Sequence, residues 1–304
     1  MNTEFKITFW GVRGGYPMPG PTTTEFGGNT TCLEIRVGSH LIIIDAGTGI
    51  IGLGRELIQK HQTTGRPIVA TLLFTHTHGD HTQGFPFFSP AMLPSSTLYI
   101  FGPRMLHDDL EDVLARAMLP SVFPIELEDL ASMRVISNIG PSEMILLEDP
   151  PSPPQMCAVR RDCPAVTSST VEIRVLQSHA HPKGGVLIYK ITFQGKQMVF
   201  ATDTEDYRGT QTILVRFAKE ADLLIHDAQY TWEDYVDGQP PKQGWGHSTW
   251  EMAAEVATAA QVKQLVLTHH EPLHDDEFLR EIEHKAQQVF PACLVAREGM
   301  TIEL

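Results

Sequence analysis

The sequence predicts an α/β fold: a four-layer αβ/βα sandwich in which two mixed β-sheets pack face to face with helices outside. Short apolar segments alternate with segments of helical periodicity, and this alternation occurs twice along the chain. In addition, side chains that can bind metals follow the ends of several apolar segments. Because sites in α/β architectures assemble at strand ends, these side chains are candidates for one shared site.

The composition indicates a soluble globular protein, since 42% of the 304 residues are hydrophobic and 20% are charged. The sequence contains no apolar stretch of membrane-spanning length and no signal-peptide pattern, so we expect a cytoplasmic protein without a membrane partner. Because α/β folds often exceed the usual ~150 residues of a domain, we expect one domain over residues 1–304. The proline-rich segment at 148–165 is interpreted as a lid or an insertion.

The net charge argues against a long nucleic acid partner, and the cysteine content argues against a disulfide framework. The formal net charge of −14 disfavours a long nucleic acid, because neutralising its phosphates supplies most of the affinity. We therefore expect a small substrate and no long nucleic acid partner. The cysteines form no Cys-x-x-Cys pair and are interpreted as buried or idle thiols in a reducing compartment; they are Cys32, Cys157, Cys163 and Cys293.

The first half of the chain predicts strands that alternate or are fully apolar, and helices with one apolar side. The predicted strands are 5–10, 32–37, 41–44, 68–74 and 97–101, the helices are 50–60 and 104–118, and 133–147 holds two short strands. The glycine-rich loop after the first strand has two readings. It could offer backbone N–H groups or Arg13 to an anion, or it could be a simple connection.

The second half repeats this style. The predicted strands are 171–176, 186–191, 196–201, 223–225 and 263–267, the helices are 210–220, 250–260 and 275–288, and two short strands follow. Ser248 or Thr249 can cap the helix at 250–260, and Glu251 fits a capping box with Ser248.

The chain is organised around the stretch His76-Thr77-His78-Gly79-Asp80-His81. A strand that continues through His78 would send the His76 and His78 imidazoles to one face, because side chains alternate with period two. Gly79 permits a sharp turn that brings Asp80 and His81 back towards the same point. The stretch therefore predicts a site with room for two metal ions.

Other residues at predicted strand ends support this site. Asp45 follows an apolar strand, and beside a histidine cluster we favour a role in fixing a ligand or the following turn over a simple helix cap. His226 and Asp227 follow a buried strand and either orient a ligand or pack in the core.

With these residues in place, the sequence resembles the metallo-β-lactamase superfamily. The histidine stretch is the specific signature, and Asp45, His181, Asp203 and His269 follow the order of the superfamily's motifs. Shorter matches resemble its phosphodiesterase branch, which includes ribonuclease Z and cyclic-nucleotide phosphodiesterase-like hydrolases. These matches are Gly27-Gly28-Asn29-Thr30-Thr31, His181-Pro182, Ala201-Thr202-Asp203-Thr204, His247-Ser248-Thr249 and Leu267-Thr268-His269.

The resemblance implies a pair of divalent ions, with Zn²⁺ as the default and Mn²⁺ or Fe²⁺ also suited to these donors. It assigns one ion to His76, His78 and His181, a second to Asp80, His81 and His269, and a bridging position to Asp203. His179 and His270 are neighbouring competitors, which the proline after His181 and the Leu-Thr-His match disfavour.

The resemblance further implies a binuclear metal-dependent hydrolase that cleaves a small phosphodiester, such as a cyclic nucleotide, by a metal-bridging hydroxide. Asp80 and His247 are the candidate catalytic residues, and His247 would bind the phosphate or protonate the leaving alkoxide. Related phosphodiesterases suggest a homodimer by analogy alone. The alternatives are a thioesterase or lactonase, or a metal- or ligand-binding protein of low turnover. Trp232, Tyr235 and Trp245 would either stack on a base or form an ordinary rim.

Overall fold

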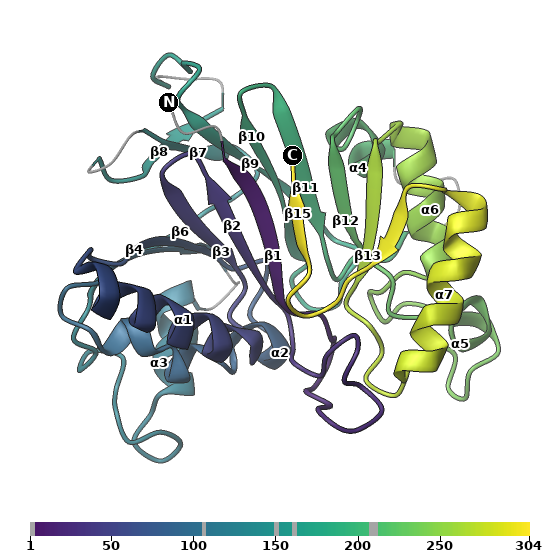
Figure 1. Ribbon diagram of the computed structural model, residues 1–304, viewed down its shortest axis with the longest axis horizontal. Helices are drawn as coiled ribbons and strands as arrows, with labels where there is room; N and C mark the ends of the chain where they lie inside the picture. Colours follow the sequence, from purple (N-terminus) through teal and green to yellow (C-terminus); the bar gives the residue numbers. More distant parts are fainter. Residues whose placement is uncertain (1–3, 105–107, 149–151, 160–162, 207–211) are drawn as a thin grey trace.

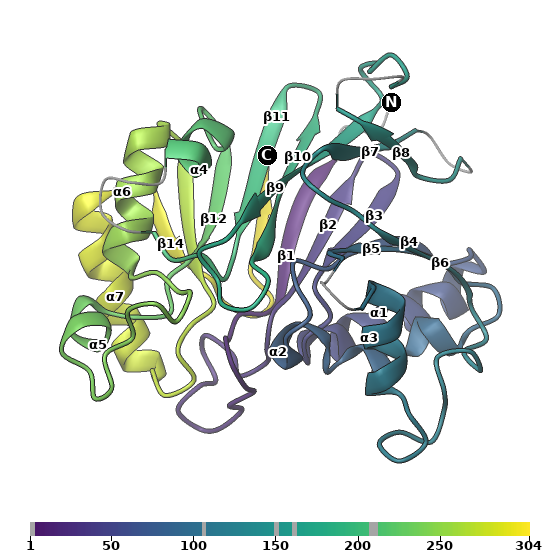
Figure 2. The ribbon, with the colours of Figure 1, turned by 180° about the vertical axis from the view of Figure 1, so that it is seen from behind.

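The computed structural model describes residues 4–104, 108–148, 152–159, 163–206 and 212–304. Two mixed β-sheets pack face to face, and helices cover the outer face of each (Figures 1 and 2). This arrangement confirms the predicted four-layer sandwich. Among the described residues, no helix is both long and apolar enough to cross a membrane.

The first sheet has the order β15-β1-β2-β3-β4-β5-β6. Its strands from β3 to β6 run parallel, whereas β15, β1, β2 and β3 pair antiparallel. The bounds are β1 Phe5–Gly11, β2 Cys32–Val37, β3 His40–Ile44, β4 Val69–Leu73, β5 Thr97–Gly102, β6 Met133–Asn138 and β15 Thr301–Glu303. The last strand of the chain thus returns to the sheet in which the chain began.

The second sheet has the order β14-β13-β12-β11-β10-β9-β7-β8. Its strands from β11 to β14 are parallel, and the other pairs are antiparallel. The bounds are β7 Glu143–Leu147, β8 Gln155–Ala158, β9 Val171–Ser178, β10 Val186–Phe193, β11 Lys196–Ala201, β12 Leu223–Asp227, β13 Gln264–Thr268 and β14 Cys293–Val295.

Helices flank the first sheet on one side of the molecule and the second sheet on the other (Figure 1). The bounds are α1 Gly49–Thr64, α2 Gly79–Thr82, α3 Leu110–Ala117, α4 Thr212–Phe217, α5 Trp232–Val236, α6 Trp250–Ala260 and α7 Asp276–Val289. One hydrophobic cluster fills the space between the sheets. A second lies between the first sheet and its helices, and a third lies between the second sheet and its helices. Strands such as β3 and β12, which lie inside the sheets, are largely apolar because both of their faces are buried.

Three local predictions differ from the structure. The strand before the histidine stretch ends at Leu73, because Thr75 donates its backbone N–H to the Asp45 carboxylate, so His76 and His78 lie on a loop. Thr249, one of the two expected candidates, caps α6, so the capping box of Glu251 with Ser248 does not form; Ser248 Oγ donates instead to the carbonyl of Thr204. The helices expected at 104–118 and 210–220 are shorter, and residues 105–107 and 207–211 lie outside the described residues.

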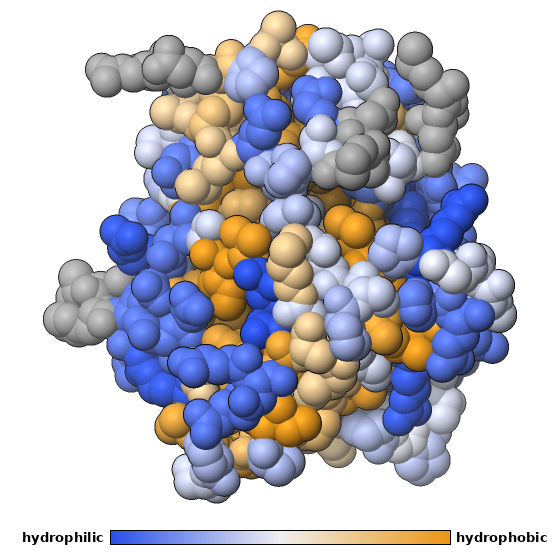
Figure 3. Space-filling view, turned by 90° about the vertical axis from the view of Figure 1, so that its left-hand side faces the viewer, coloured by the Kyte–Doolittle hydropathy of each residue, from blue (hydrophilic) through white to orange (hydrophobic). Residues whose placement is uncertain are grey.

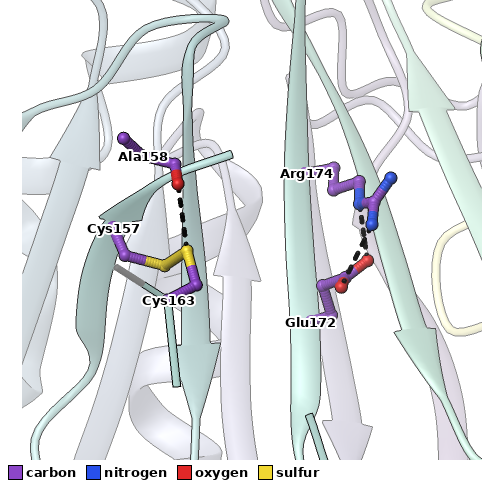
Figure 4. Close-up of a disulfide and its surroundings, with 5 residues drawn as sticks. All are labelled: Cys157, Ala158, Cys163, Glu172 and Arg174. Carbon is purple, nitrogen blue, oxygen red and sulfur yellow. Dashed lines mark hydrogen bonds and ion pairs between the residues drawn. A yellow bond between two sulfur atoms is a disulfide. The ribbon is translucent and has the colours of Figure 1, made fainter. Parts of the chain in front are cut away.

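The proline-rich segment contains an edge strand of the second sheet. Within it, β8 pairs antiparallel with β7, while residues 149–151 and 160–162 lie outside the described residues. The expectation of idle thiols is wrong here, because Cys157 and Cys163 form a disulfide, with Cα atoms 5.5 Å apart (Figure 4). The disulfide thus joins two cysteines that no sequence pattern pairs. Cys32 and Cys293 are free and buried.

Figure 3 shows the side of the molecule on which β6 and β8 lie, and hydrophobic side chains reach the surface in the middle of this face. Met133 and Val135 on β6 are among the exposed hydrophobic residues. Both belong to an edge strand of the first sheet, where a strand lacks a neighbour on one side. This apolar surface is distinct from the strand ends that carry the histidine stretch.

Candidate metal centre

The predicted site residues gather at the edge of the sandwich where several strands end. The carboxyl ends of β3, β4, β11 and β13 lead directly to Asp45, the histidine stretch, Asp203 and His269. His181 comes from the loop between β9 and β10. In Figure 1 this edge is the lower one, where α2 lies beside the N-terminal loop. Residues from five separate connections therefore share one site.

Asp45 positions the histidine stretch. Its carboxylate accepts hydrogen bonds from Thr75 N and Thr75 Oγ1, both at 2.8 Å. It also lies 2.8 Å from His81 Nδ1, so this nitrogen donates and Nε2 is left as the electron-pair donor for a ligand. Asp45 thus orients a candidate ligand, the type of role favoured from the sequence.

Three of these residues adopt a left-handed backbone conformation that directs their side chains into the site. Asp45, Asp203 and His269 have φ values of 61°, 51° and 63°, which only a few per cent of non-glycine residues adopt. Such a conformation costs about 1–3 kcal/mol and persists only where the surrounding structure enforces it. Each of the three follows the end of a strand, and the left-handed turn redirects the side chain across the edge of the sheet.

A first group of candidate ligands consists of His76, His78 and His181. His181 Nε2 lies 3.1 Å from His78 Nδ1, and the buried His76 Nε2 has no hydrogen-bond partner among the described residues. Burial lowers the pKa of each of the three imidazoles. They are therefore neutral at physiological pH, which is the form that binds a metal.

A second group consists of Asp80, His81, Asp203 and His269, all buried. Asp203 Oδ2 lies 3.1 Å from His81 Nε2 and 3.3 Å from His269 Nε2. Burial opposes charge on Asp203, but His269, His81 and His76 together hold its pKa well below the usual range. Burial likewise opposes charge on His269, yet Asp203 and Asp80 raise its pKa to about 9. Positive charge is thus favoured at this point, and a divalent cation would supply it in place of protons.

Asp203 faces both groups. Its Oδ1 lies 3.7 Å from His76 Nε2 and 3.9 Å from His181 Nε2, whereas Oδ2 faces the second group. All the donor atoms are imidazole nitrogens or carboxylate oxygens, a set that suits Zn²⁺, Mn²⁺ or Fe²⁺. The unpartnered buried nitrogen of His76 and the shared carboxylate fit a pair of divalent ions.

His247 lies beside these groups and is held by Asp227. Its Nδ1 is 2.9 Å from Asp227 Oδ2, and its ring stacks on that of His269 with centroids 5.0 Å apart. Asp227 also accepts hydrogen bonds from the backbone N–H groups of Asp203 and Ser248. The sequence left the role of Asp227 open between orienting a ligand and packing. The structure places it at the centre of this network, whereas His226 pairs with Asp206 at 2.6 Å.

The N-terminal loop lies over the site, but Arg13 does not face it. Arg13 is buried and donates to the carbonyl oxygens of Gly27, Glu271 and His274, so it ties loops together. The backbone N–H of Gly15 donates to Asp80 Oδ2 at 2.7 Å. The loop therefore contributes one backbone group to a candidate ligand.

The competing histidines and the aromatic loop are also placed. His270 is buried with Nε2 2.9 Å from the carbonyl of Ala296, and His179 is exposed outside the candidate groups. Tyr235 is buried and donates to Glu205, so it is not available to stack on a base. Trp245 is exposed, with Lys242 Nζ 4.0 Å from its ring centroid.

Packing at Gly14 supports His269, which yields a testable prediction. A methyl group at Gly14 would collide with the imidazole of His269, whereas one at Gly20 would meet nothing within 4 Å. Gly14→Ala is therefore expected to displace His269 and weaken Zn²⁺ binding about 10–100-fold, as loss of ligand positioning does. Calorimetric titration of Zn²⁺ into the metal-free protein measures this, with Gly20→Ala as the matched control. Equal affinities in the two variants would contradict the prediction.

Comparison with known proteins agrees with this geometry. A ribonuclease Z from Metallosphaera sedula is 29% identical and aligns over 96% of this chain and 97% of its own length. The metallo-β-lactamase fold protein YhfI from Bacillus subtilis superposes with a TM-score of 0.66 at 18% identity, covering 99% of this chain and 100% of its own. The short form of human tRNase Z gives a TM-score of 0.60 at 21% identity, with 98% of each chain covered. At these identities the two structures demonstrate a shared fold.

One prediction from composition is wrong. The acidic balance led us to expect no long nucleic acid partner, yet the relatives include a ribonuclease and a tRNase, whose names denote action on RNA. The net charge of −14 is a sum over the whole chain, whereas recognition of a phosphate depends on the charge around the site. Net charge therefore does not exclude RNA for this fold.

The family assignment rests on the longest match. A family described as the β-lactamase superfamily domain matches residues 40–270, more than half of the chain. This range contains the histidine stretch, His181, Asp203 and His269. The chain therefore belongs to the metallo-β-lactamase superfamily and is a metal-dependent hydrolase.

Proposed function

We propose that this chain hydrolyses phosphodiester bonds with two divalent cations, most suitably Zn²⁺, held by the two groups of side chains described above. The single observation that carries the proposal is the position of Asp203, whose two carboxylate oxygens face His76 on one side and His81 on the other. A carboxylate between two sets of ligands is suited to bridge a cation pair. The ligands would be His76, His78 and His181 for one cation, and Asp80, His81 and His269 for the other.

A cation pair at this position supplies charge neutralisation for the phosphate and lowers the pKa of a water molecule. The residues of the chain provide the remaining functions. Asp80, whose Oδ2 accepts a hydrogen bond from the N–H of Gly15, would orient that water and accept its proton. Since a carboxylate only accepts hydrogen bonds, Asp227 requires the proton of His247 to be on Nδ1. His247 Nε2 is then the ring atom that can bind the phosphate or serve the leaving oxygen.

The substrate class that we propose is a phosphodiester of RNA, because relatives that align over nearly their full length are ribonucleases. A small phosphodiester, such as a cyclic nucleotide, is the second candidate. It is favoured by a pocket of about 970 Å³ that His181 lines, within the ~300–1,000 Å³ that small-molecule sites usually have.

Chelation tests the proposal. The purified protein is expected to hydrolyse bis-p-nitrophenyl phosphate, to lose this activity in EDTA, and to regain it when Zn²⁺, Mn²⁺ or Fe²⁺ is restored, because every proposed ligand serves a cation. Metal analysis of the same samples should find close to two ions per chain. Thioester and lactone substrates, assayed in parallel, address the alternative hydrolase activities. Absence of chelator-sensitive phosphodiester cleavage with all three metals would contradict the proposal.

A further inference from the structure

A pocket adjoins the first group of candidate ligands. Its volume is about 970 Å³, and His181 belongs both to its wall and to the group with His76 and His78. The other charged or ionisable side chains of its lining are Arg104, His179, Lys183 and Glu205. Because one histidine separates the pocket from the metal centre, a ligand in the pocket would lie next to a phosphate bound there.

The pocket carries net positive charge in an acidic chain. Arg104 and Lys183 are exposed, and neither forms an ion pair within the described part of the chain. Its one acidic side chain, Glu205, is buried and accepts hydrogen bonds from the Tyr235 hydroxyl and the N–H groups of Gly244 and Gly246. The carboxylate of Glu205 is thus engaged by the protein, while the positively charged side chains of Arg104 and Lys183 are available to a ligand.

The loop that carries Lys183 has a defined shape. Lys183, Gly184 and Gly185 have φ values of 63°, 155° and 75°, and a methyl group at Gly185 would collide with the carbonyl of Ser178. On the other side, His181 Nδ1 lies 3.1 Å from the carbonyl oxygen of Gly246. The conformation of this turn holds Lys183 at the wall of the pocket, close in sequence to the candidate ligand His181.

We propose that this pocket binds a second phosphate of the substrate, adjacent to the phosphodiester that is cleaved. The inference rests on the proposed function and deepens it, because it requires a substrate with at least two phosphates. The side chains of Arg104 and Lys183 can form charge-assisted hydrogen bonds to a bound phosphate, and the planar guanidinium of Arg104 can engage two phosphate oxygens at once. The second phosphate can be an internal diester of an RNA chain or a terminal monoester of a short nucleotide.

Short RNA substrates separate these cases. The dinucleotide UpU has one phosphate, UpUpU adds a diester, and pUpU and UpUp add a terminal monoester at either end. We expect kcat/KM of the wild-type protein to be at least about tenfold higher for one or more of the substrates with two phosphates, the usual effect of a charged hydrogen bond. A gain with UpUpU identifies the RNA backbone as the source, and a gain limited to pUpU or UpUp identifies a terminal phosphate.

The variants Arg104→Ala, Lys183→Ala and their combination test the assignment of the pocket. Each single change is expected to lower kcat/KM about tenfold for the preferred substrate, and the double variant should lose the preference over UpU. The salt dependence of log kcat/KM should become shallower by about 0.7, the value for one neutralised phosphate of a single strand. The double variant Arg55→Ala/Lys219→Ala removes the same charges from α1 and from the turn after α4 and is the matched control.

Bis-p-nitrophenyl phosphate has one phosphate, so its cleavage tests the proposed phosphodiesterase function separately from the proposed binding of a second phosphate. If all variants and the wild type cleave it equally, the phosphodiesterase is intact and the RNA substrates report on the pocket alone. A wild-type protein without preference for any substrate with two phosphates would overturn the inference. So would a preference that survives in the Arg104→Ala/Lys183→Ala variant. If the wild-type protein did not cleave bis-p-nitrophenyl phosphate at all, the proposed function itself would be contradicted.

Discussion

Asp203→Asn is expected to abolish tight binding of the cation pair and, with it, phosphodiester cleavage. The Asp203 carboxylate faces candidate ligands of both groups, at 3.7 Å from His76 Nε2 and 3.1 Å from His81 Nε2. Substitution of residues that merely orient a ligand weakens metal binding about 10–100-fold, so the loss of a shared anionic ligand should exceed about 100-fold. Metal analysis after dialysis and kcat/KM for bis-p-nitrophenyl phosphate measure the two effects.

Asp222→Asn is the matched control for this substitution. Asp222 precedes the amino end of β12 and accepts hydrogen bonds from Lys263 and from the backbone of Gln197, far along the strand from the metal centre. The Asp222→Asn variant should bind both ions and retain phosphodiesterase activity. If Asp203→Asn retained two ions per chain and normal turnover, Asp203 would not be a shared ligand, and the binuclear proposal would fail.

His247→Gln is expected to lower kcat for an RNA phosphodiester by about 10²–10⁴-fold while both ions stay bound, as removal of a general acid does. His247 lies outside the two proposed ligand sets, and Asp227 holds its Nδ1 at 2.9 Å. Nitrophenolate is a good leaving group that needs little protonation. Cleavage of bis-p-nitrophenyl phosphate should therefore be affected much less than cleavage of RNA.

The comparison of these two substrates decides the role of His247. An equal loss for both substrates would assign His247 to phosphate binding and not to proton donation. Loss of metal from His247→Gln would instead make it a ligand, since His247 also forms a group with Asp203, Asp227 and His269. His284→Gln, on the exposed face of α7, is the control and should leave both activities unchanged.

Much of the fold was predictable because buried parallel strands leave a strong local signal. The largely apolar runs that became β3, β4, β12 and β13 are mostly buried, and no partner needs to be known to recognise them. Strand ends were less predictable. The strand before the histidine stretch stops at Leu73 because Asp45, 30 residues earlier in the chain, captures the N–H of Thr75.

Features that depend on distant contacts were not predictable. From the sequence, the loop of Arg13 could either offer this side chain to an anion or be a simple connection; in the structure Arg13 is buried against carbonyl groups of Glu271 and His274 at the other end of the chain. The Cys157–Cys163 disulfide joins two cysteines whose spacing matches no recognised pattern. The exclusion of RNA failed for a related reason, because a net charge does not reveal where the charges lie.

The sequence alone determined which types of donor follow the strand ends: the histidine stretch and the later Asp203 and His269 supply imidazole and carboxylate groups there. Only the tertiary structure decided how the donors meet. Asp80 and His269 are separated by 189 residues yet lie 3.2 Å apart, and Asp203 reaches both groups through a left-handed backbone turn. The physical reason is that residue types follow local patterns, whereas distances and strained turns are set by packing of the whole sandwich.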